Sequence, residues 1–219
     1  MKRILLMVSA FLMCYNSYTQ TSAEPKMHVL KYDFFSPVGG CFGFSLETGK
    51  TNFTSLDIDA GFIGLKLGDY FQYDKFVGGY LSAGPRFYFK KDMAMQNANN
   101  FKGAYFKPEL LVNFFAFEDL WEYYDYLSNV TFQEEITGTD LSVSLLLALG
   151  NQWVLSDMVT FDIWFGLGYG GNWVSDDHDP ALDDIYYYEP DQSYKFSYVR
   201  FGDSPLIFDG GLSIGILLK

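Results

Sequence analysis

The chain of 219 residues is poor in cysteine, histidine and positive charge, and it lacks a long hydrophobic run. It has two Cys and two His, and 15 Lys and Arg stand against 27 Asp and Glu, a formal net charge of −12. A nucleic-acid partner is not expected, because a phosphate backbone is bound by a basic surface. Beyond residue 20 no uncharged apolar stretch reaches the roughly 18 residues of a membrane-spanning helix, which excludes a helical membrane bundle. Aromatic residues, in contrast, make up 20% of the chain, a content that excludes intrinsic disorder.

The first segment of the chain has the pattern of a secretory signal peptide. Met1–Arg3 is basic, Ile4–Cys14 is mostly apolar, and small residues follow at Ser17 and Thr19. We predict cleavage after Thr19, or in second place after Ala23. The apolar stretch is too short to cross a bilayer as a helix. An uncleaved anchor and a lipoprotein processed at Cys14 are less favoured alternatives.

The predicted division is a signal peptide at residues 1–19 and one domain at residues 20–219. Removal of the signal peptide deletes two basic residues and no acid, so the mature chain has 13 basic and 27 acidic side chains, a net charge of −14. The mature chain retains only Cys41, which cannot form an internal disulfide. The exported domain must therefore be stabilised in another way.

From residue 27 onward, apolar side chains recur at every second position. In 160–170 the odd positions are all apolar, whereas the even positions are Thr, Asp, Trp or Gly. A period of two is typical of a β-strand whose two faces have different surroundings. Pro85 and Pro108 lack the N–H that donates to a neighbouring strand, so each is expected at a bulge or a strand end. The alternation predicts eight strands, at 27–35, 40–48, 54–67, 79–91, 103–117, 139–155, 159–173 and 205–219.

The contents of the two faces indicate how these strands assemble. One face is large and aliphatic or aromatic on every strand, and the other has Gly, Ser and isolated charges. A single sheet with such an apolar face would aggregate, whereas closure into a barrel removes the unpaired edges and lipid covers the apolar face. We therefore predict an all-β fold, an eight-stranded antiparallel up-and-down transmembrane β-barrel. A secreted soluble barrel or sandwich, with the apolar face as its core, is the alternative.

The connections between these strands alternate between the two ends of the barrel. With a periplasmic N-terminus, the two longest, 118–138 and 174–204, both lie outside the cell, as expected for outer-membrane barrels. Residues 118–138 include six acids and no Lys or Arg, and 174–204 includes eight acids against Lys195 and Arg200. The negative charge is thus concentrated at the outer rim. The other expected connections are 36–39 and 68–78 outside, and 49–53, 92–102 and 156–158 inside.

Charged residues on the small-residue face are predicted to form a salt-bridged network inside the barrel. An eight-stranded barrel is filled by side chains, and an unpaired buried charge is very costly. Arg86 and Lys107 are the expected centre, with Glu47, Glu109 and Asp162 as first partners. A lumen that conducts ions or protons is the alternative. The predicted network comprises Lys31, Glu47, Asp57, Asp59, Arg86, Lys107, Glu109 and Asp162, and Asp33 and Asp209 face the same interior.

Aromatic residues also cluster in and beside the two long outer connections. They suit the aromatic girdle of a membrane barrel, and Tyr-rich loops also suit binding surfaces. The spacing of Leu120, Tyr124 and Leu127 predicts a short helix over 118–128. The candidate binding residues are Trp121, Tyr123, Tyr124, Tyr126, Tyr186, Tyr187 and Tyr188.

No pattern in the sequence predicts catalysis, a metal site or a cofactor. His28 lies near Ser36 in the sequence and His178 lies among aspartates, but no complete set of base, partner and orienting group can be placed. The acidic stretch 176–179 has oxygen ligands suited to Ca²⁺ or Mg²⁺. The twelve-residue calcium loop is missing, however, so a solvated loop is expected. We predict a non-enzymatic protein with no cofactor and no metal.

A Gly-Pro-Arg-Phe-Tyr-Phe segment (Gly84–Phe89) and a glycine-rich closing strand add to the signal peptide and the alternating strands. With these features nearly the whole mature chain resembles small eight-stranded outer-membrane barrels of Gram-negative bacteria, the OmpA/OmpX type. Such barrels usually end in an aromatic residue, whereas this chain ends in Lys219. The resemblance implies an outer-membrane location, contact with lipid and lipopolysaccharide, and a structural role or a partner subunit in an outer-membrane assembly. The alternatives are a surface binding protein that acts through 118–138 and 174–204 and, less favoured, a small channel.

Overall fold

A computed structural model gives the fold of most of the chain from residue 28 onward. It describes residues 28–49, 53–64, 75–89, 101–125, 130–156, 158–177, 199–200 and 206–218, and the predicted signal peptide lies outside them. Within this part of the chain, no helix has the length and hydropathy that a membrane-spanning helix needs. The elements are β1 (His28–Asp33), the 3₁₀ helix η1 (Ser36–Gly39), β2 (Cys41–Gly49), β3 (Thr54–Ile63), β4 (Lys75–Tyr88), β5 (Gly103–Asp125), β6 (Val130–Leu155), β7 (Val159–Asp176), β8 (Val199–Arg200) and β9 (Leu206–Leu218).

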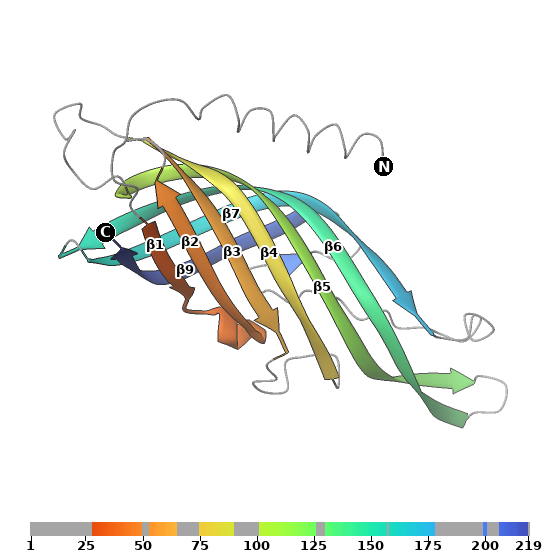
Figure 1. Cartoon of the computed structure of the whole chain (residues 1–219). Coiled ribbons are helices and arrows are strands. Elements are labelled where there is room, and N and C mark those ends of the chain that lie inside the picture. Colours follow the sequence, from red (N-terminus) through yellow and green to blue (C-terminus); the bar gives the residue numbers. More distant parts are fainter. Residues whose placement is uncertain are drawn as a thin grey trace.

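The strands form a closed antiparallel barrel (Figure 1). β1 to β7 pair in chain order, β7 pairs with β9, and β9 closes the wall by pairing with β1. The two-residue β8 pairs with β9 at Ile207 and Phe208, beyond the stretch that pairs with β1, so the other eight strands make the wall. The predicted fold class is confirmed. We call the end where β1 begins and β9 ends the terminal end. The opposite end, where β5 ends and β6 begins, is called the hairpin end.

Side chains alternate between the inside and the outside of the wall as the sequence predicts. On β7, Ile163 and Phe165 are exposed on the outer face, whereas Asp162 and Trp164 are buried inside. Residues paired across two strands lie on the same face, so the register extends this alternation around the barrel. Along the middle of the wall the outer face is therefore apolar, and the charged side chains there lie inside.

β5 and β6 continue beyond the other strands at the hairpin end (Figure 1). β4 pairs with β5 as far as Glu118, and β7 pairs with β6 as far as Gly138. β5 and β6, however, pair with each other up to Asp125 and Val130. At about 3.3 Å per residue, this two-stranded extension is roughly 20 Å long. We call it the β5–β6 ribbon, residues 119–125 and 130–136.

The ribbon corrects two predictions. The expected outer loop at 118–138 is mostly strand, and the expected helix over 118–128 is wrong. Pairing across the ribbon gives these backbone N–H and C=O groups the partners that a helix would have given them. The helical spacing of Leu120 and Tyr124 therefore had no bearing on the local structure.

Other strand ends also differ from the prediction. β3 ends at Ile63 and not at 67, and β4 runs from Lys75 to Tyr88 and not from 79 to 91. Lys75 extends β4 because Glu118 faces it across the ladder. Part of the expected loop at 174–204 is likewise strand, in β7 and β8.

Pro85 and Pro108 lie opposite each other in mid-strand, and the prediction of a bulge or strand end is wrong. The β4–β5 pairing has one register on both sides, through Ala83 opposite Leu110 and Phe87 opposite Phe106, with an interruption between. No bulge is present there, because a bulge would shift the register. Both prolines fall in the same interruption, so one local break in the ladder accommodates two missing donors.

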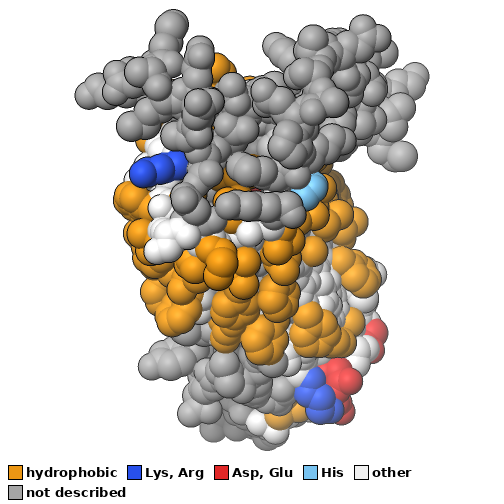
Figure 2. Space-filling model, turned by 60° about the vertical axis from the view of Figure 1, so that its left-hand side comes forward, with side chains coloured by type: hydrophobic (Ala, Val, Ile, Leu, Met, Phe, Trp, Pro, Cys, Tyr) orange, Lys and Arg blue, Asp and Glu red, His pale blue; other side chains and the backbone are white. Residues whose placement is uncertain are grey.

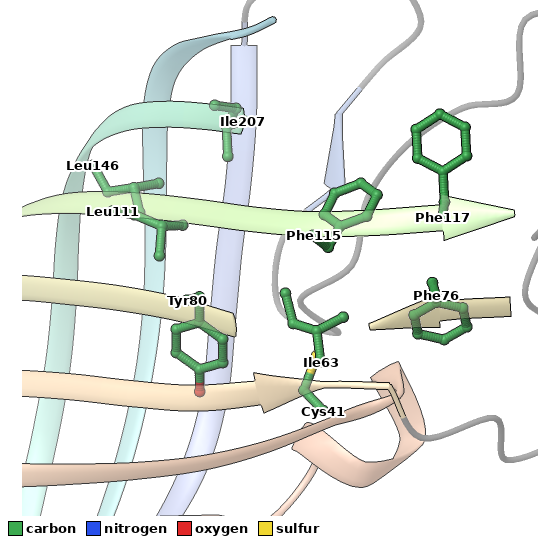
Figure 3. Close-up of a cluster of buried hydrophobic side chains, with 9 residues drawn as sticks. All are labelled: Cys41, Ile63, Phe76, Tyr80, Leu111, Phe115, Phe117, Leu146 and Ile207. Atoms are coloured by element: carbon green, nitrogen blue, oxygen red, sulfur yellow. The ribbon is translucent and has the colours of Figure 1, made fainter. Parts of the chain in front are cut away.

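The interior contains a large apolar cluster in the hairpin half of the barrel, with side chains from several strands (Figure 3). A second, smaller cluster of Val29, Phe101 and Leu217 lies at the terminal end. The large cluster consists of Cys41, Ile63, Phe76, Tyr80, Leu111, Phe115, Phe117, Leu146 and Ile207. The polar interior between these two clusters holds the candidate functional site.

Candidate functional site

Three buried cations from three strands meet in the terminal half of the barrel interior. Lys31, Arg86 and Lys107 come from β1, β4 and β5, and none is more than 4% exposed. Strand pairing brings carboxylates to the same level, since Glu47 on β2 is the direct neighbour of Asp57 on β3. The alternation points all of these side chains inward. Their meeting depends on strand pairing and not on closeness in the sequence.

Arg86 lies at the centre of this network. Its Nη2 and Nε atoms donate to Oδ2 of Asp57 at 2.6 and 3.1 Å, and its Nη1 donates to Oδ2 of Asp162 at 2.5 Å. The guanidinium carbon lies 4.3 Å from the centroid of the Tyr105 ring, within the range of a cation–π contact. The planar guanidinium of arginine can donate to two carboxylates while its face stacks on a ring, whereas the ammonium of lysine has no planar face to stack.

Two lysines extend the network to both sides of Arg86. Asp162 contacts Arg86 and Lys31, and Asp57 contacts all three cations, with Lys31 the most distant at 3.9 Å, so both acids are shared acceptors. Asp57 was predicted as a member of the network but not as a first partner. The ion pairs of the lysines are Lys31–Glu47 (2.5 Å), Lys31–Asp162 (3.4 Å), Lys107–Glu109 (2.7 Å) and Lys107–Asp57 (3.3 Å).

Neutral side chains donate to the same carboxylates. Tyr88, Tyr105 and Gln152 were not predicted as members of the network. They face inward like Arg86 and Lys107, so the two-residue alternation could have identified them. Burial of a carboxylate without such donors would cost more than its ion pairs return. The hydrogen bonds are Tyr88–Glu47 (2.6 Å), Tyr105–Asp162 (2.9 Å), Gln152–Glu47 (3.2 Å), Ser55–Glu47 and Ser82–Glu109.

The remaining predicted interior acids lie on the hairpin side of the network. Asp33 and Asp59 are buried and line a cavity of about 10 Å³, room for roughly one water, next to Arg86 and Lys107. Asp209 is buried and accepts from Nε1 of Trp164 at 3.2 Å. Carboxylates outnumber cations among the buried side chains that the structure describes. The buried acids are Asp33, Glu47, Asp57, Asp59, Glu109, Asp140, Asp162 and Asp209.

His28 and Ser36, which are close in the sequence, lie at opposite ends of β1. His28 begins β1 at the terminal end, with Nδ1 3.1 Å from Oγ1 of Thr48, and Ser36 follows β1 at the hairpin end. His178 lies outside the described residues. Among the residues that are described, no group of three or more His, Cys, Asp or Glu is placed to hold a metal ion.

The structure places part of the predicted aromatic binding surface. Trp121, Tyr123 and Tyr124 lie in the ribbon portion of β5, so they belong to a strand and not to a loop. Tyr126 and the run 186–188 lie outside the described residues. The ribbon and the charge network are at opposite halves of the molecule, so they form two separate candidate sites.

No known protein family matches the sequence, and no curated protein is significantly similar to it. Among solved structures, the chain is similar to the crystal structure of the N-terminal β-barrel domain of Pseudomonas aeruginosa OprF. The identity is 10%, the match covers 90% of this chain and 100% of that one, and the TM-score is 0.35. A likeness at this level says nothing about the role of the chain. The fold assignment follows instead from the closed strand pairing.

Proposed function

We propose that the protein is a non-enzymatic, non-conducting integral barrel of the outer membrane that serves as a structural element or as a partner subunit of an outer-membrane assembly. The observation that supports this proposal is the inside-out distribution of its side chains. Large apolar residues such as Leu147, Phe165 and Ile216 are more than half exposed on the outer face, whereas Lys31, Arg86 and the carboxylates around them are buried. Water does not stabilise such a surface, but lipid does.

The apolar outer face forms a continuous band. In Figure 2 the hydrophobic side chains cover the middle of the visible face, and Lys, Arg, Asp and Glu gather beyond the edge of the band. Outward positions from 141 to 155 on β6 and from 159 to 173 on β7 include no Asp, Glu, Lys or Arg. Both runs exceed the 9–11 residues with which a tilted strand crosses a bilayer. The band is therefore tall enough to span the hydrocarbon layer.

The interior is closed in a way that supports a non-conducting role. The network of three cations and their carboxylates fills the terminal half. Val29, Phe101 and Leu217 cover it at the terminal end, and the large apolar cluster lies on its hairpin side. Phe101 is held there by Nε2 of Gln152, which donates to its backbone oxygen at 2.8 Å. Ions crossing the barrel would have to pass charged and apolar layers that are both packed.

The mature protein should migrate faster on a semi-native gel before heating than after heating, because a closed barrel resists detergent denaturation until it is heated. The sample is an outer-membrane fraction of cells that express the full chain. The same purified protein should give no single-channel current in planar bilayers. A soluble monomer that needs no detergent would contradict the membrane proposal, and discrete current steps would contradict the non-conducting role.

A surface binding role is the second candidate, and the β5–β6 ribbon favours it. The ribbon extends beyond the wall with no other strand paired to 119–125 or 130–136 among the described residues, and it is rich in acidic residues. Replacing 119–136 by a short turn should leave the heat-dependent gel shift intact, because the wall pairing ends at Glu118 and Gly138. Loss of binding to cells or matrix proteins would then identify a binder. Unchanged binding would exclude this role for the ribbon.

A further inference from the structure

β4 and β5 lie side by side in the wall (Figure 1), and the ladder between them is interrupted near the terminal end. From the hairpin end, pairing continues to Ala83 opposite Leu110 and resumes at Phe87 opposite Phe106 in the same register. Every other ladder between described wall strands is continuous. We call the unpaired positions 84–86 and 107–109, with the pairs that border them, the β4–β5 seam.

The interruption removes two backbone hydrogen bonds. Neighbouring pairs of an antiparallel ladder alternate between pairs that exchange two N–H···O=C bonds and pairs that exchange none. The N–H of Phe89 donates to the carbonyl of Ala104 at 2.8 Å, so Pro85 and Pro108, two alternations further along, occupy a bonded position. Neither proline has an N–H to donate. Both bonds of this pair are therefore missing.

Gly84 keeps the two strands close although these bonds are missing. A Cβ atom at this position would overlap the backbone oxygen of Pro108, so only glycine allows this approach. The Cα–H of a glycine is a weaker donor to a carbonyl than an N–H. The backbone therefore holds β4 and β5 together less firmly at the seam than the continuous ladders hold the other strands.

Side chains of the ion network cross the seam on the inside. Arg86 of β4 lies over the ring of Tyr105 of β5, with the guanidinium carbon 4.3 Å from the ring centroid. Nη2 of Arg86 and Nζ of Lys107 are 2.6 and 3.3 Å from the same oxygen, Oδ2 of Asp57 on β3. Asp57 thus links a cation of β4 to a cation of β5 beside the missing bonds. We call Arg86, Lys107, Asp57 and Tyr105 the Arg86 bridge.

We propose that the β4–β5 seam is the part of the wall that opens while the other ladders stay paired, and that the Arg86 bridge keeps it closed. Opening a continuous ladder breaks two backbone bonds at every second pair, whereas one such set is already absent at the seam. Parting the strands also separates Arg86 from Tyr105 and Asp57 from one of its cations. An open seam gives water access to the charged interior, where a small cavity borders Arg86 and Lys107. The pairing of the wall supports this inference independently of the membrane location.

Amide hydrogen exchange of the full mature chain in detergent micelles, followed by NMR, tests the inference. The probes are the N–H groups of Ala83, Leu110, Phe87 and Phe106 at the seam, and the protected amides of 145–149 and 165–169 in the continuous β6–β7 ladder. We expect the seam amides to exchange at least about tenfold faster, because local opening exposes them without unfolding of the barrel. Equal exchange at the two ladders would overturn the inference.

Variants separate the missing bonds from the Arg86 bridge. Arg86→Lys keeps the charge but cannot stack on Tyr105, so it should speed exchange at the seam by about a further fivefold relative to β6–β7. Replacing Pro85 and Pro108 together with alanine supplies both missing donors and should slow the seam amides to the rates of β6–β7. Asp209→Asn, a change of a buried acid on β9, is the control and should leave the ratio unchanged.

The heat-dependent gel shift, measured on the same samples, shows which variants are folded. The comparison within the wild-type chain needs no substitution, so it decides the matter even if Arg86→Lys loses the shift. Seam amides that stay fast in the double proline variant would overturn the inference. Loss of the gel shift in that variant would overturn it as well, because two restored bonds should strengthen the wall.

Discussion

Replacing Arg86 with methionine should lower the free energy of unfolding by about 3–5 kcal/mol, the cost of removing one partner from a buried ion pair. The change leaves the carboxylates of Asp57 and Asp162 inside the barrel without the donor that contacts both at 2.5–2.6 Å. Lys31 and Lys107 are the other cations near these acids, at 3.3 Å or more. The measurement is urea unfolding of the protein in detergent micelles or lipid vesicles, with the folded fraction read from the heat-dependent gel shift.

Three further variants show whether the loss of stability comes from carboxylates left buried without their cation. Arg86→Lys keeps the charge but not the fork, so it should lose less stability than Arg86→Met. Adding Asp162→Asn to Arg86→Met should recover part of the lost stability, because one of the two unpaired buried charges is removed. Asp209→Asn is the matched control: Asp209 is as buried as Arg86, at 2% exposure, and its isostere keeps an acceptor for Trp164. A loss below about 1 kcal/mol for Arg86→Met, or an equal loss for Asp209→Asn, would contradict the role of the network.

Replacing Leu147 with arginine should lower the free energy of unfolding from lipid vesicles by about 2–4 kcal/mol, the cost of an arginine at the bilayer midplane. Leu147 is 52% exposed on the outer face, midway along the charge-free run of β6. In the proposed membrane location its environment is hydrocarbon, which cannot solvate a guanidinium. The measurement is equilibrium unfolding from vesicles, with folded fractions read from the same gel shift.

The same substitution beyond the apolar band is the control. Leu120 is 45% exposed on the outer face of the ribbon, past the end of the β4–β5 pairing at Glu118. Leu120→Arg should therefore change stability by less than about 0.5 kcal/mol. In a water-soluble barrel both positions would face water and both substitutions would be tolerated alike. Equal effects at the two positions would thus contradict the membrane location.

The two faces of the wall could be predicted from the sequence because a strand has a period of two. The odd positions from Phe161 to Tyr169 and the charged residues on the opposite face separate lipid-facing from interior side chains without knowledge of any neighbour. The inward position of Lys31, Arg86 and Lys107 follows from the same rule. The β5–β6 ribbon could not be found in this way, because its strands have no single apolar face and are stabilised by pairing with each other.

The partners within the candidate site could not be predicted either. Lys31 and Asp162 are 131 residues apart, and Arg86 and Asp162 are 76 residues apart, yet both pairs are in contact. Which inward side chains share a level depends on the stagger of all eight strands around the closed wall. A shift of one strand by two residues would keep every side chain on its face and would replace its partners.

The sequence by itself thus determined the number of wall strands, the face on which each side chain lies and the inward position of the charges in the middle of the wall, since all three depend on the two-residue period of a strand. Only the tertiary structure decided that Asp57 is shared by Arg86 and Lys107, that apolar clusters lie on both sides of the network, and that β5 and β6 extend beyond the wall. These features depend on register and closure, which are set by contacts between residues far apart in the chain.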